Sequence, residues 1–311
     1  MENNKLNFAF WGTPEVAKET LEILKQNGFL PSLIVTAPDK PQGRKMIITP
    51  PPVKVWAIEN KIPFIQPENL SSKDLLLAGV SQADGPRGSA VPVGTDSDPI
   101  KVEPLLDLSI VVAYGKILSE EILNLPKFGS INVHYSLLPK YRGASPVESA
   151  ILNGEKETGV TIQKMAFKLD SGPIIAQEKT EVGETETAPE LKKRLIKIGA
   201  NLLIKVLNTP SFFLPLAKGE VPKAEGVRLI QQDEAKATYC KKIKKEDGLI
   251  DLATGSPSEL YNKFRAYAGW PRTFFFKDGK RYIITKATLE NGVFTVKRVI
   301  PEGKKETDYR E

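Results

Sequence analysis

The apolar residues of the first 140 positions occur in short runs, separated by segments with helical periodicity. This alternation is typical of βαβ units, in which crossover helices join parallel strands. Helix patterns lie at residues 14–27, just before Gly28, and at 119–125, and Thr13 is the expected cap of the first helix, with Pro14 its first residue. The sequence therefore predicts an α/β, Rossmann-like domain with a mostly parallel sheet, whose strands are expected at 6–10, 33–35, 110–113 and 131–133.

A long helical pattern at residues 188–207 follows an expected strand at 173–179. The next segment, 208–226, is rich in turn-forming residues and is interpreted as a linker between two domains. Beyond it the pattern is mainly β, with a hairpin turn at residues 277–280 and a helix near 257–268. We therefore expect a catalytic domain at 1–207 and a smaller, mainly β domain at 227–311, with strands at 272–276, 281–285 and 293–299.

Residues 78–99 interrupt the α/β pattern of the first domain. The segment is rich in Gly, Pro, Ser and Asp, contains no aromatic residue and shows no stable period. Loops of this length are uncommon inside a compact domain. We interpret the segment as an atypical flexible insertion and assign it no function.

Composition excludes several classes of protein. The 311 residues are 41% hydrophobic and 26% charged, and no apolar run approaches the ~20 residues of a membrane span. The N-terminus lacks the apolar core of a signal peptide, which predicts a cytoplasmic protein. A single cysteine, Cys240, excludes an internal disulfide, and we expect a structural thiol and not a nucleophile. Only Gly12 follows the first strand, so a dinucleotide site has no support and Gly12 is expected in a tight turn.

The basic residues are concentrated in the last third of the chain. Residues 205–311 contain 21 Lys and Arg against 14 Asp and Glu, whereas the first 204 residues contain 23 against 24. Such an asymmetry suggests contact with a polyanion, because Lys and Arg displace counterions from phosphates. Composition alone leaves two interpretations open, an RNA-binding surface and an ordinary solvated basic face.

The only histidine of the chain, His134, follows Asn132 by two positions on an apolar strand. Strand alternation places both side chains on one face. Open α/β sheets bind ligands at the carboxyl ends of their strands, and both residues lie there. A lone histidine is equally often a structural residue, so these two residues alone leave the choice open.

Two motifs resolve the choice. The run at residues 131–143, INVHYSLLPKYRG, resembles the signature of the formyltetrahydrofolate-dependent formyltransferases, and the LDSG run at 169–172 resembles their aspartate loop. With the first strand and the C-terminal segment, the resemblance covers nearly the whole chain. It implies that Asn132, His134 and Asp170 are catalytic, that 10-formyltetrahydrofolate is the formyl donor, and that no metal is needed.

These residue types suit the implied reaction. When an amine attacks the formyl carbon, negative charge grows on the carbonyl oxygen, and donors such as Asn132 and His134 lower the barrier there. A carboxylate such as Asp170 orients the imidazole and accepts, directly or through water, the proton that the amine loses.

Two further stretches resemble the folate-binding segments of this family. In the run 111–116, VVAYGK, backbone groups are expected to pair with the planar ring while the Tyr114 side chain covers it. A plain core strand accounts for Val111 and Val112 equally well. The resemblance implies folate contacts from Tyr114, Gly115, Ser136, Leu137, Leu138 and Pro139.

The formyl acceptor is predicted from two other segments. Residues 38–44, PDKPQGR, are similar to the mobile loop of the branch whose acceptor is initiator methionyl-tRNA. Residues 238–248 and 261–271 resemble its small OB-like barrel, a fold that often binds nucleic acid on a basic face. The resemblance implies a monomeric enzyme of translation initiation with tRNA contacts from Lys40, Arg44, Lys45, Lys241, Lys242, Lys244 and Lys245.

Other acceptors stay open, because the Asn-His-Asp triplet is shared by several enzymes. The amine of glycinamide ribonucleotide, a sugar-nucleotide amine and water are the alternatives within the family, and a non-catalytic RNA-binding protein is an alternative outside it. The chain also departs from the family pattern in two places. Residues 45–52 are more apolar than the usual basic stretch, and 78–99 lengthen the chain by about twenty residues.

Overall fold

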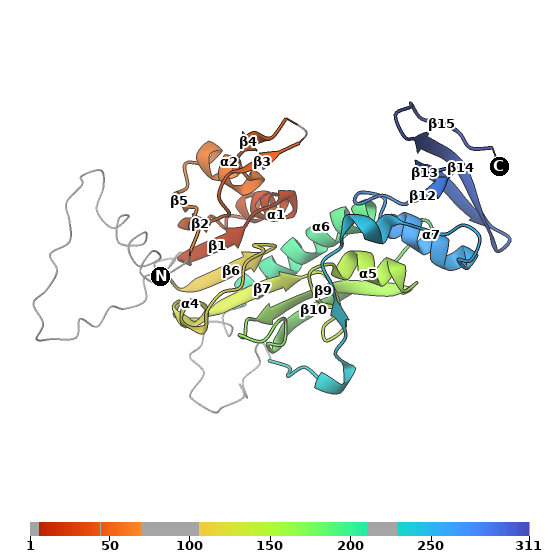
Figure 1. Ribbon diagram of the computed structural model, residues 1–311. Coiled ribbons are helices and arrows are strands. Elements are labelled where there is room, and N and C mark those ends of the chain that lie inside the picture. The colour runs from red at the N-terminus through yellow and green to blue at the C-terminus, as the bar shows by residue number, and fades with distance from the viewer. Residues whose placement is uncertain (1–5, 44, 70–105, 210–228, 311) are drawn as a thin grey trace, which may run out of the picture. The chain divides into compact units, whose positions relative to one another are not determined.

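The computed structural model describes residues 6–43, 45–69, 106–209 and 229–310. Its main sheet has seven strands in the order β10-β9-β7-β6-β1-β2-β5 (Figure 1). Every pairing from β7 to β5 is parallel, which confirms the predicted α/β class. The strands are β1 (Phe8–Gly12), β2 (Leu33–Val35), β5 (Phe64–Ile65), β6 (Leu108–Val112), β7 (Ser130–His134), β9 (Glu157–Lys164) and β10 (Ile174–Glu181).

Both faces of the central strands are covered, so β1, β2 and β6 are buried along their whole length. Strands buried on both faces are continuous apolar runs instead of alternating ones. Helices α1 (Glu15–Gln26) and α2 (Pro52–Glu59) cover one face, and α4 (Glu120–Asn124) packs on the other (Figure 1). The core beneath α4 contains Ala9, Trp11, Leu33, Val35, Val111, Tyr114, Ile122 and Leu123.

Two local predictions at the start of α1 are wrong. Pro14, and not Thr13, is the N-cap residue, and the Thr13 hydroxyl donates instead to the Tyr114 carbonyl at 3.2 Å. Gly12 is the last residue of β1 and not part of a turn. A Cβ at Gly12 would lie 2.6 Å from the Ala17 Cβ, so glycine is needed because the helix passes close to the strand. Neither contact is visible in the local sequence.

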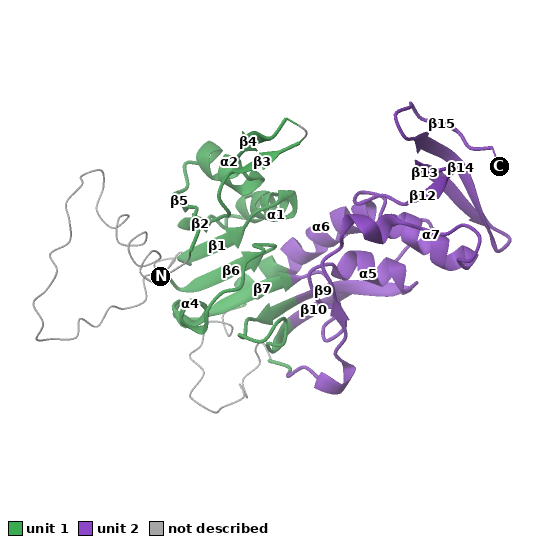
Figure 2. Cartoon of the chain, in the orientation of Figure 1, with its two compact units in different colours: residues 1–133, 162–175, 203–230 green, residues 134–161, 176–202, 231–311 purple. Residues whose placement is uncertain are grey.

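The chain divides into two compact units that do not follow its linear order (Figure 2). Unit 1 comprises residues 1–133, 162–175 and 203–230, and unit 2 comprises 134–161, 176–202 and 231–311. The predicted insertion at 78–99 and nearly all of the predicted linker at 208–226 lie outside the described residues. The proposed catalytic and C-terminal domains, divided at that linker, therefore stay a prediction.

The C-terminal part of unit 2 has an antiparallel sheet, as the sequence predicts. Its strands are β12 (Phe274–Lys277), β13 (Lys280–Glu290), β14 (Val293–Pro301) and β15 (Thr307–Asp308), in that order. Asp278 and Gly279 have φ values of 51° and 71°, as a two-residue hairpin turn with both central residues in the left-handed region requires. Helix α7 (Pro257–Ala266) packs against the strands over a core of Ile250, Leu260, Phe275, Ile284, Ala287 and Val299.

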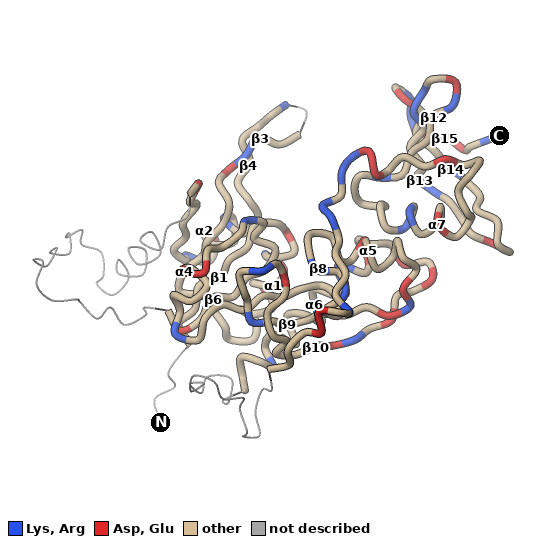
Figure 3. Tube along the Cα trace, turned by 60° about the horizontal axis from the view of Figure 1, so that its bottom comes forward, with Lys and Arg blue, Asp and Glu red and all other residues tan. Residues whose placement is uncertain are grey.

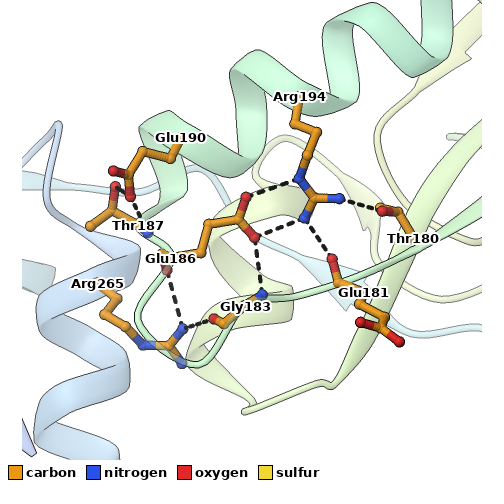
Figure 4. Close-up of polar contacts among 8 residues, drawn as sticks. All are labelled: Thr180, Glu181, Gly183, Glu186, Thr187, Glu190, Arg194 and Arg265. Carbon is orange, nitrogen blue, oxygen red and sulfur yellow. Dashed lines mark hydrogen bonds and ion pairs between the residues drawn. The ribbon is translucent and has the colours of Figure 1, made fainter.

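Two arginines hold the turn before helix α6 (Ala188–Leu207): Arg194 from α6 itself, and Arg265 from α7 (Figure 4). The Arg194 guanidinium donates to the Glu186 carboxylate through Nε at 3.0 Å and Nη2 at 2.8 Å. Arg265 on α7 donates through Nη1 to the carbonyls of Gly183 and Glu186 at 3.0 and 3.1 Å. The Arg265 side chain is buried, and this desolvation lowers its pKa. Residues far apart in sequence are thus fixed to each other within unit 2.

Candidate active site

The carboxyl end of β7 carries the two predicted donors. Asn132 is half-buried, and His134 is 5% exposed. Strand alternation puts both side chains on one face of β7, as predicted. Asn132 is in register with Val111, so it lies beside the last residues of β6 at the edge where open α/β sheets bind ligands.

The His134 ring is held by the loop that follows its strand. Its Nε2 lies 2.9 Å from the carbonyl oxygen of Tyr141. Because a carbonyl oxygen can only accept, Nε2 carries the ring proton in this contact.

Tyr141 itself is buried and fixed through several groups. Its hydroxyl donates to Glu155 at 2.7 Å, and burial raises the pKa of this phenol to about 12. Lys140 also binds Glu155 at 2.9 Å, and this contact, more than any other, lowers the pKa of that carboxyl. The Tyr141 backbone is left-handed, with φ of 61°, a conformation that persists only where surrounding contacts hold it.

Asp170 is positioned by an amide that sequence reasoning missed. Gln163 on β9 is 1% exposed, and its Nε2 donates to Asp170 Oδ1 at 3.0 Å. Asp170 has a φ of 46°, and a Cβ at Gly172 would lie 1.7 Å from the Lys164 carbonyl oxygen. The aspartate turn is therefore tightly constrained. In the segment VTIQK at 160–164, Val160 and Ile162 alternate with polar residues, so the sequence carried no local signal that Gln163 is buried.

The three predicted catalytic residues fall in different compact units. Asn132 and Asp170 belong to unit 1, and His134 belongs to unit 2. Asn132 and His134 are nevertheless held next to each other, because they are two residues apart on the same strand, β7. The assignment of all three to one catalytic group stays a prediction, carried by the motifs.

The predicted folate segment after β6 offers backbone groups more than side chains. The Tyr114 ring is 4% exposed and packs edge-on against Trp11, with 5.3 Å between centroids. Burial raises the pKa of its phenol to about 12. This side chain is thus part of the core, whereas Ala113 and Gly115 are exposed at left-handed φ values of 48° and 80°. Exposed backbone donors and acceptors of this kind suit the edge of a flat heterocycle.

In the second predicted folate segment, only two side chains reach solvent. The buried Ser136 hydroxyl donates to the Lys140 carbonyl at 2.6 Å, and Leu138 is 3% exposed. Thr161 and Gln177 bind the backbone of this loop through their side chains. Leu137 and Pro139 are half-buried, so they are the apolar groups that this loop presents.

The loop similar to the mobile acceptor loop forms a hairpin of β3 (Lys40–Gln42) and β4 (Ile47–Thr49). Lys40 and Lys45 are exposed, while Arg44 lies outside the described residues. The apolar side chains next to Lys45 are also exposed, at 66% for Met46, 62% for Ile47 and 70% for Ile48. The hairpin thus combines basic and apolar groups at its surface.

A second group of predicted tRNA contacts lies after β11 (Tyr239–Cys240), where basic positions recur along the trace (Figure 3). Lys241, Lys242, Lys244 and Lys245 are all exposed. No shared function follows from exposure alone, because a solvated basic run has the same appearance. Their role stays a prediction.

Arg142 is a second residue that sequence reasoning missed. Its side chain is fully buried, at 0% exposure, and its Nη2 donates to Glu234 at 2.6 Å and to Gln232 at 2.8 Å. The Glu234 carboxylate is the main cause of a raised pKa of the guanidinium. A buried arginine requires such partners, and here they come from about 90 residues later in the chain.

In the described ranges, His, Cys, Asp and Glu side chains form no group of three or more that could hold a metal ion. Of the helices that the structure describes, none has the length and apolar character to cross a membrane.

The formyl transferase family model matches residues 5–207, and the model for the formyl transferase C-terminal domain matches residues 242–309. The chain is 42% identical over 266 residues to methionyl-tRNA formyltransferase of Thermotoga maritima, covering 86% of this chain and 74% of the relative. The corresponding enzyme of a Sulfurihydrogenibium species is 38% identical, covering 90% and 80%.

Solved structures show the same fold at low sequence identity. Methionyl-tRNA formyltransferase from Clostridium thermocellum has a TM-score of 0.59 at 18% identity, covering 98% of this chain and all of that one. An N-formyltransferase from Helicobacter canadensis, in complex with folinic acid and dTDP-3-aminofucose, has a TM-score of 0.58 at 19% identity, covering 92% and 88%. The chain belongs to the formyl transferase family.

Proposed function

We propose that this protein transfers the formyl group of 10-formyltetrahydrofolate to the amino group of methionine on initiator methionyl-tRNA. The proposal rests on sequence identity: about two residues in five are identical to those of relatives named methionyl-tRNA formyltransferase, over most of the chain. The placement of Asn132 and His134 at the carboxyl end of β7 supports a transfer site at that edge. The folate supplies an electrophilic formyl carbon.

Asn132 donates a hydrogen bond to the formyl oxygen as its negative charge grows. His134, whose Nε2–H is held by the Tyr141 carbonyl, donates to the same oxygen from Nδ1 when that nitrogen is protonated. Such donors act best when they are fixed before the reaction. The Tyr141 carbonyl holds the imidazole through Nε2. Asp170, held by Gln163, orients the imidazole and takes up the proton of the attacking amine, directly or through water. The bond between the formyl carbon and the folate nitrogen then breaks, and tetrahydrofolate leaves with a proton on that nitrogen.

The folate ring is bound by the exposed backbone at Ala113 to Gly115 and by the loop after β7. The position of the first segment, beside Asn132, supports this assignment. Leu137 and Pro139 supply apolar contacts to the folate. Ser136 and Leu138 are buried and stabilise the loop conformation instead. Tyr114 contributes its backbone, because its ring is buried against Trp11.

The tRNA is bound by the β3–β4 hairpin and by the basic run that begins at Lys241. The relatives' printed names support this choice of acceptor. The exposure of Lys40 and Lys45 on the hairpin supports phosphate contacts there. A role in translation initiation places the protein in the cytoplasm, and we propose that it acts as a monomer.

An acceptor comparison tests the proposal. The purified protein is incubated with 10-formyltetrahydrofolate and either methionyl initiator tRNA, a sugar-nucleotide amine, glycinamide ribonucleotide or no acceptor. We expect transfer to the tRNA to exceed transfer to either small amine by about 10²-fold or more, because the basic surfaces contribute binding energy only with tRNA. Preferred transfer to a small amine, or release of formate without an acceptor, would assign the protein to another branch.

Neutralising the basic run is expected to weaken tRNA binding in a salt-dependent way. The quadruple change of Lys241, Lys242, Lys244 and Lys245 to Gln should flatten the slope of log K against log salt by about 0.7–0.9 per lost phosphate contact. A filter-binding series from low to high salt measures this slope. The matched control changes four exposed lysines elsewhere in unit 2 by the same net charge, namely Lys156, Lys179, Lys193 and Lys197. Equal slopes for the two quadruple variants would remove the run from the interface.

A further inference from the structure

A segment from beyond the linker is bound to the loop that follows β7. Strand β8 (Arg142–Gly143) pairs in parallel with β11 (Tyr239–Cys240). The Arg142 N–H donates to the Thr238 carbonyl at 2.8 Å, and the Thr238 N–H donates to the Pro139 carbonyl at 3.2 Å. A Cβ on Gly143 would lie 2.3 Å from the Cys240 carbonyl oxygen, so the two strands meet as closely as glycine allows.

Side chains of the same segment surround the Tyr141 backbone. The Tyr141 N–H donates to Thr238 Oγ1 at 2.8 Å. The Cys240 Sγ lies 3.4 Å from the Tyr141 carbonyl oxygen and 3.4 Å from that of Arg142. The peptide groups on both sides of Tyr141 are therefore fixed by residues almost 100 positions later in the chain.

This fixation matters because Tyr141 has an unfavourable backbone conformation. Its φ is 61°, in the left-handed region that a bulky residue rarely adopts. Such a conformation persists only where surrounding contacts enforce it, and it is commonly found at functional sites. The carbonyl that Tyr141 directs in this conformation is the one that accepts from His134 Nε2 at 2.9 Å.

We infer that Thr238 is a positioning residue for His134, acting through the Tyr141 peptide, with Cys240 supporting the same carbonyl. The Thr238 hydroxyl fixes the peptide before Tyr141 through the Tyr141 N–H, and the Thr238 carbonyl fixes the peptide after it through the Arg142 N–H. The second peptide contains the Tyr141 carbonyl, so the two contacts together fix the direction of this carbonyl, which sets the ring nitrogen of His134 that carries the proton. The inference rests on the proposed function only where it assigns His134 to formyl transfer. The orientation of the ring is a property of the free protein.

The single histidine of the chain makes this inference directly measurable. In a ¹⁵N-labelled sample, the two imidazole nitrogens seen by long-range ¹H–¹⁵N NMR belong to His134. At about pH 9, well above the ordinary imidazole range near 6.5, we expect a single tautomer with the proton on Nε2. Thr238→Val removes the Oγ1 acceptor at nearly constant shape, and should move the two nitrogen shifts towards each other as both tautomers become populated.

Three variants complete the experiment. Thr238→Ser keeps the acceptor and should restore the wild-type spectrum, and Cys240→Ala should give a smaller change in the same direction as Thr238→Val. Thr20→Val is the matched control, because its hydroxyl donates only within α1, to the Val16 carbonyl at 2.9 Å. It should leave the spectrum unchanged. Wild-type nitrogen shifts in Thr238→Val would overturn the inference, whatever the result for Cys240→Ala.

Kinetics separate this inference from the proposed function. We expect Thr238→Val to lower kcat for formyl transfer by about tenfold and to change KM by less than about twofold, since a small misplacement of a catalytic group acts on the chemical step. A change in the spectrum together with no formyl transfer by the wild-type protein would keep the positioning role and refute the function. Formyl transfer by the wild-type protein, together with an unchanged kcat and an unchanged spectrum in Thr238→Val, would keep the proposed function and refute the positioning role.

Discussion

Alanine in place of His134 is expected to lower kcat for formyl transfer by about 10²–10⁴-fold, the range in which a general acid–base group or an oxyanion donor contributes. The variant loses both the donor to the formyl oxygen and the bond to the Tyr141 carbonyl. Single-turnover rates with saturating donor and acceptor measure the effect. A circular dichroism melt establishes that the variant is folded.

His134→Gln is an intermediate variant for the same experiment. Its side-chain amide can still donate to the formyl oxygen or to the Tyr141 carbonyl, but it does not titrate. Its kcat should therefore lie between those of the wild type and the alanine variant. A near-normal kcat in His134→Ala would exclude the imidazole from the reaction, whatever the result for glutamine.

Asp170→Asn is expected to lower kcat by about 10²–10³-fold without loss of structure. Asparagine is nearly isosteric, and its Oδ1 can still accept from Gln163 Nε2, so the substitution removes the charge and keeps the contact. The effect should therefore fall on kcat, because the carboxylate acts on the proton of the amine and not on binding. Steady-state kinetics with tRNA and folate varied in turn separate kcat from the two KM values.

Gln163→Met provides the complementary variant, since it removes the donor and leaves the Asp170 charge in place. We expect a smaller loss, of about tenfold, because the aspartate turn is also constrained by Gly172. If Asp170→Asn kept the wild-type kcat while Gln163→Met lost activity, the turn and not the carboxylate would be the functional element.

Much of the fold could be predicted because the responsible signals are local. The strands and helices of the parallel sheet follow from apolar runs and helical spacing, and the turn at Asp278 and Gly279 follows from its residue types. Local patterns failed at Thr13 and Gly12, whose roles depend on Tyr114 and Ala17. The Tyr114 ring was expected against the folate but packs against Trp11, over 100 residues away.

The residues of the candidate site also fall into those that a local motif predicts and those that depend on distant partners. Asn132, His134 and Asp170 could be proposed because their motifs are continuous runs of sequence. Gln163, Arg142 and Thr238 could not, since each acts through a partner that only folding brings close. Arg142 meets Gln232 and Glu234, and Thr238 meets Tyr141 across 97 positions. A single sequence contains no record of such pairs, so the groups that hold a site are harder to predict than the groups that react.

The most direct test of formyl transfer follows the formyl group itself. The protein, in excess over 10-formyltetrahydrofolate labelled with ¹⁴C in the formyl group, is mixed with methionyl initiator tRNA and quenched over a time course. After mild hydrolysis of the ester, we predict that the label is recovered as formylmethionine, at a rate that His134→Ala reduces by about 10²-fold or more. Label that stays on the folate, or is released as free formate while the methionine stays unmodified, would contradict the account.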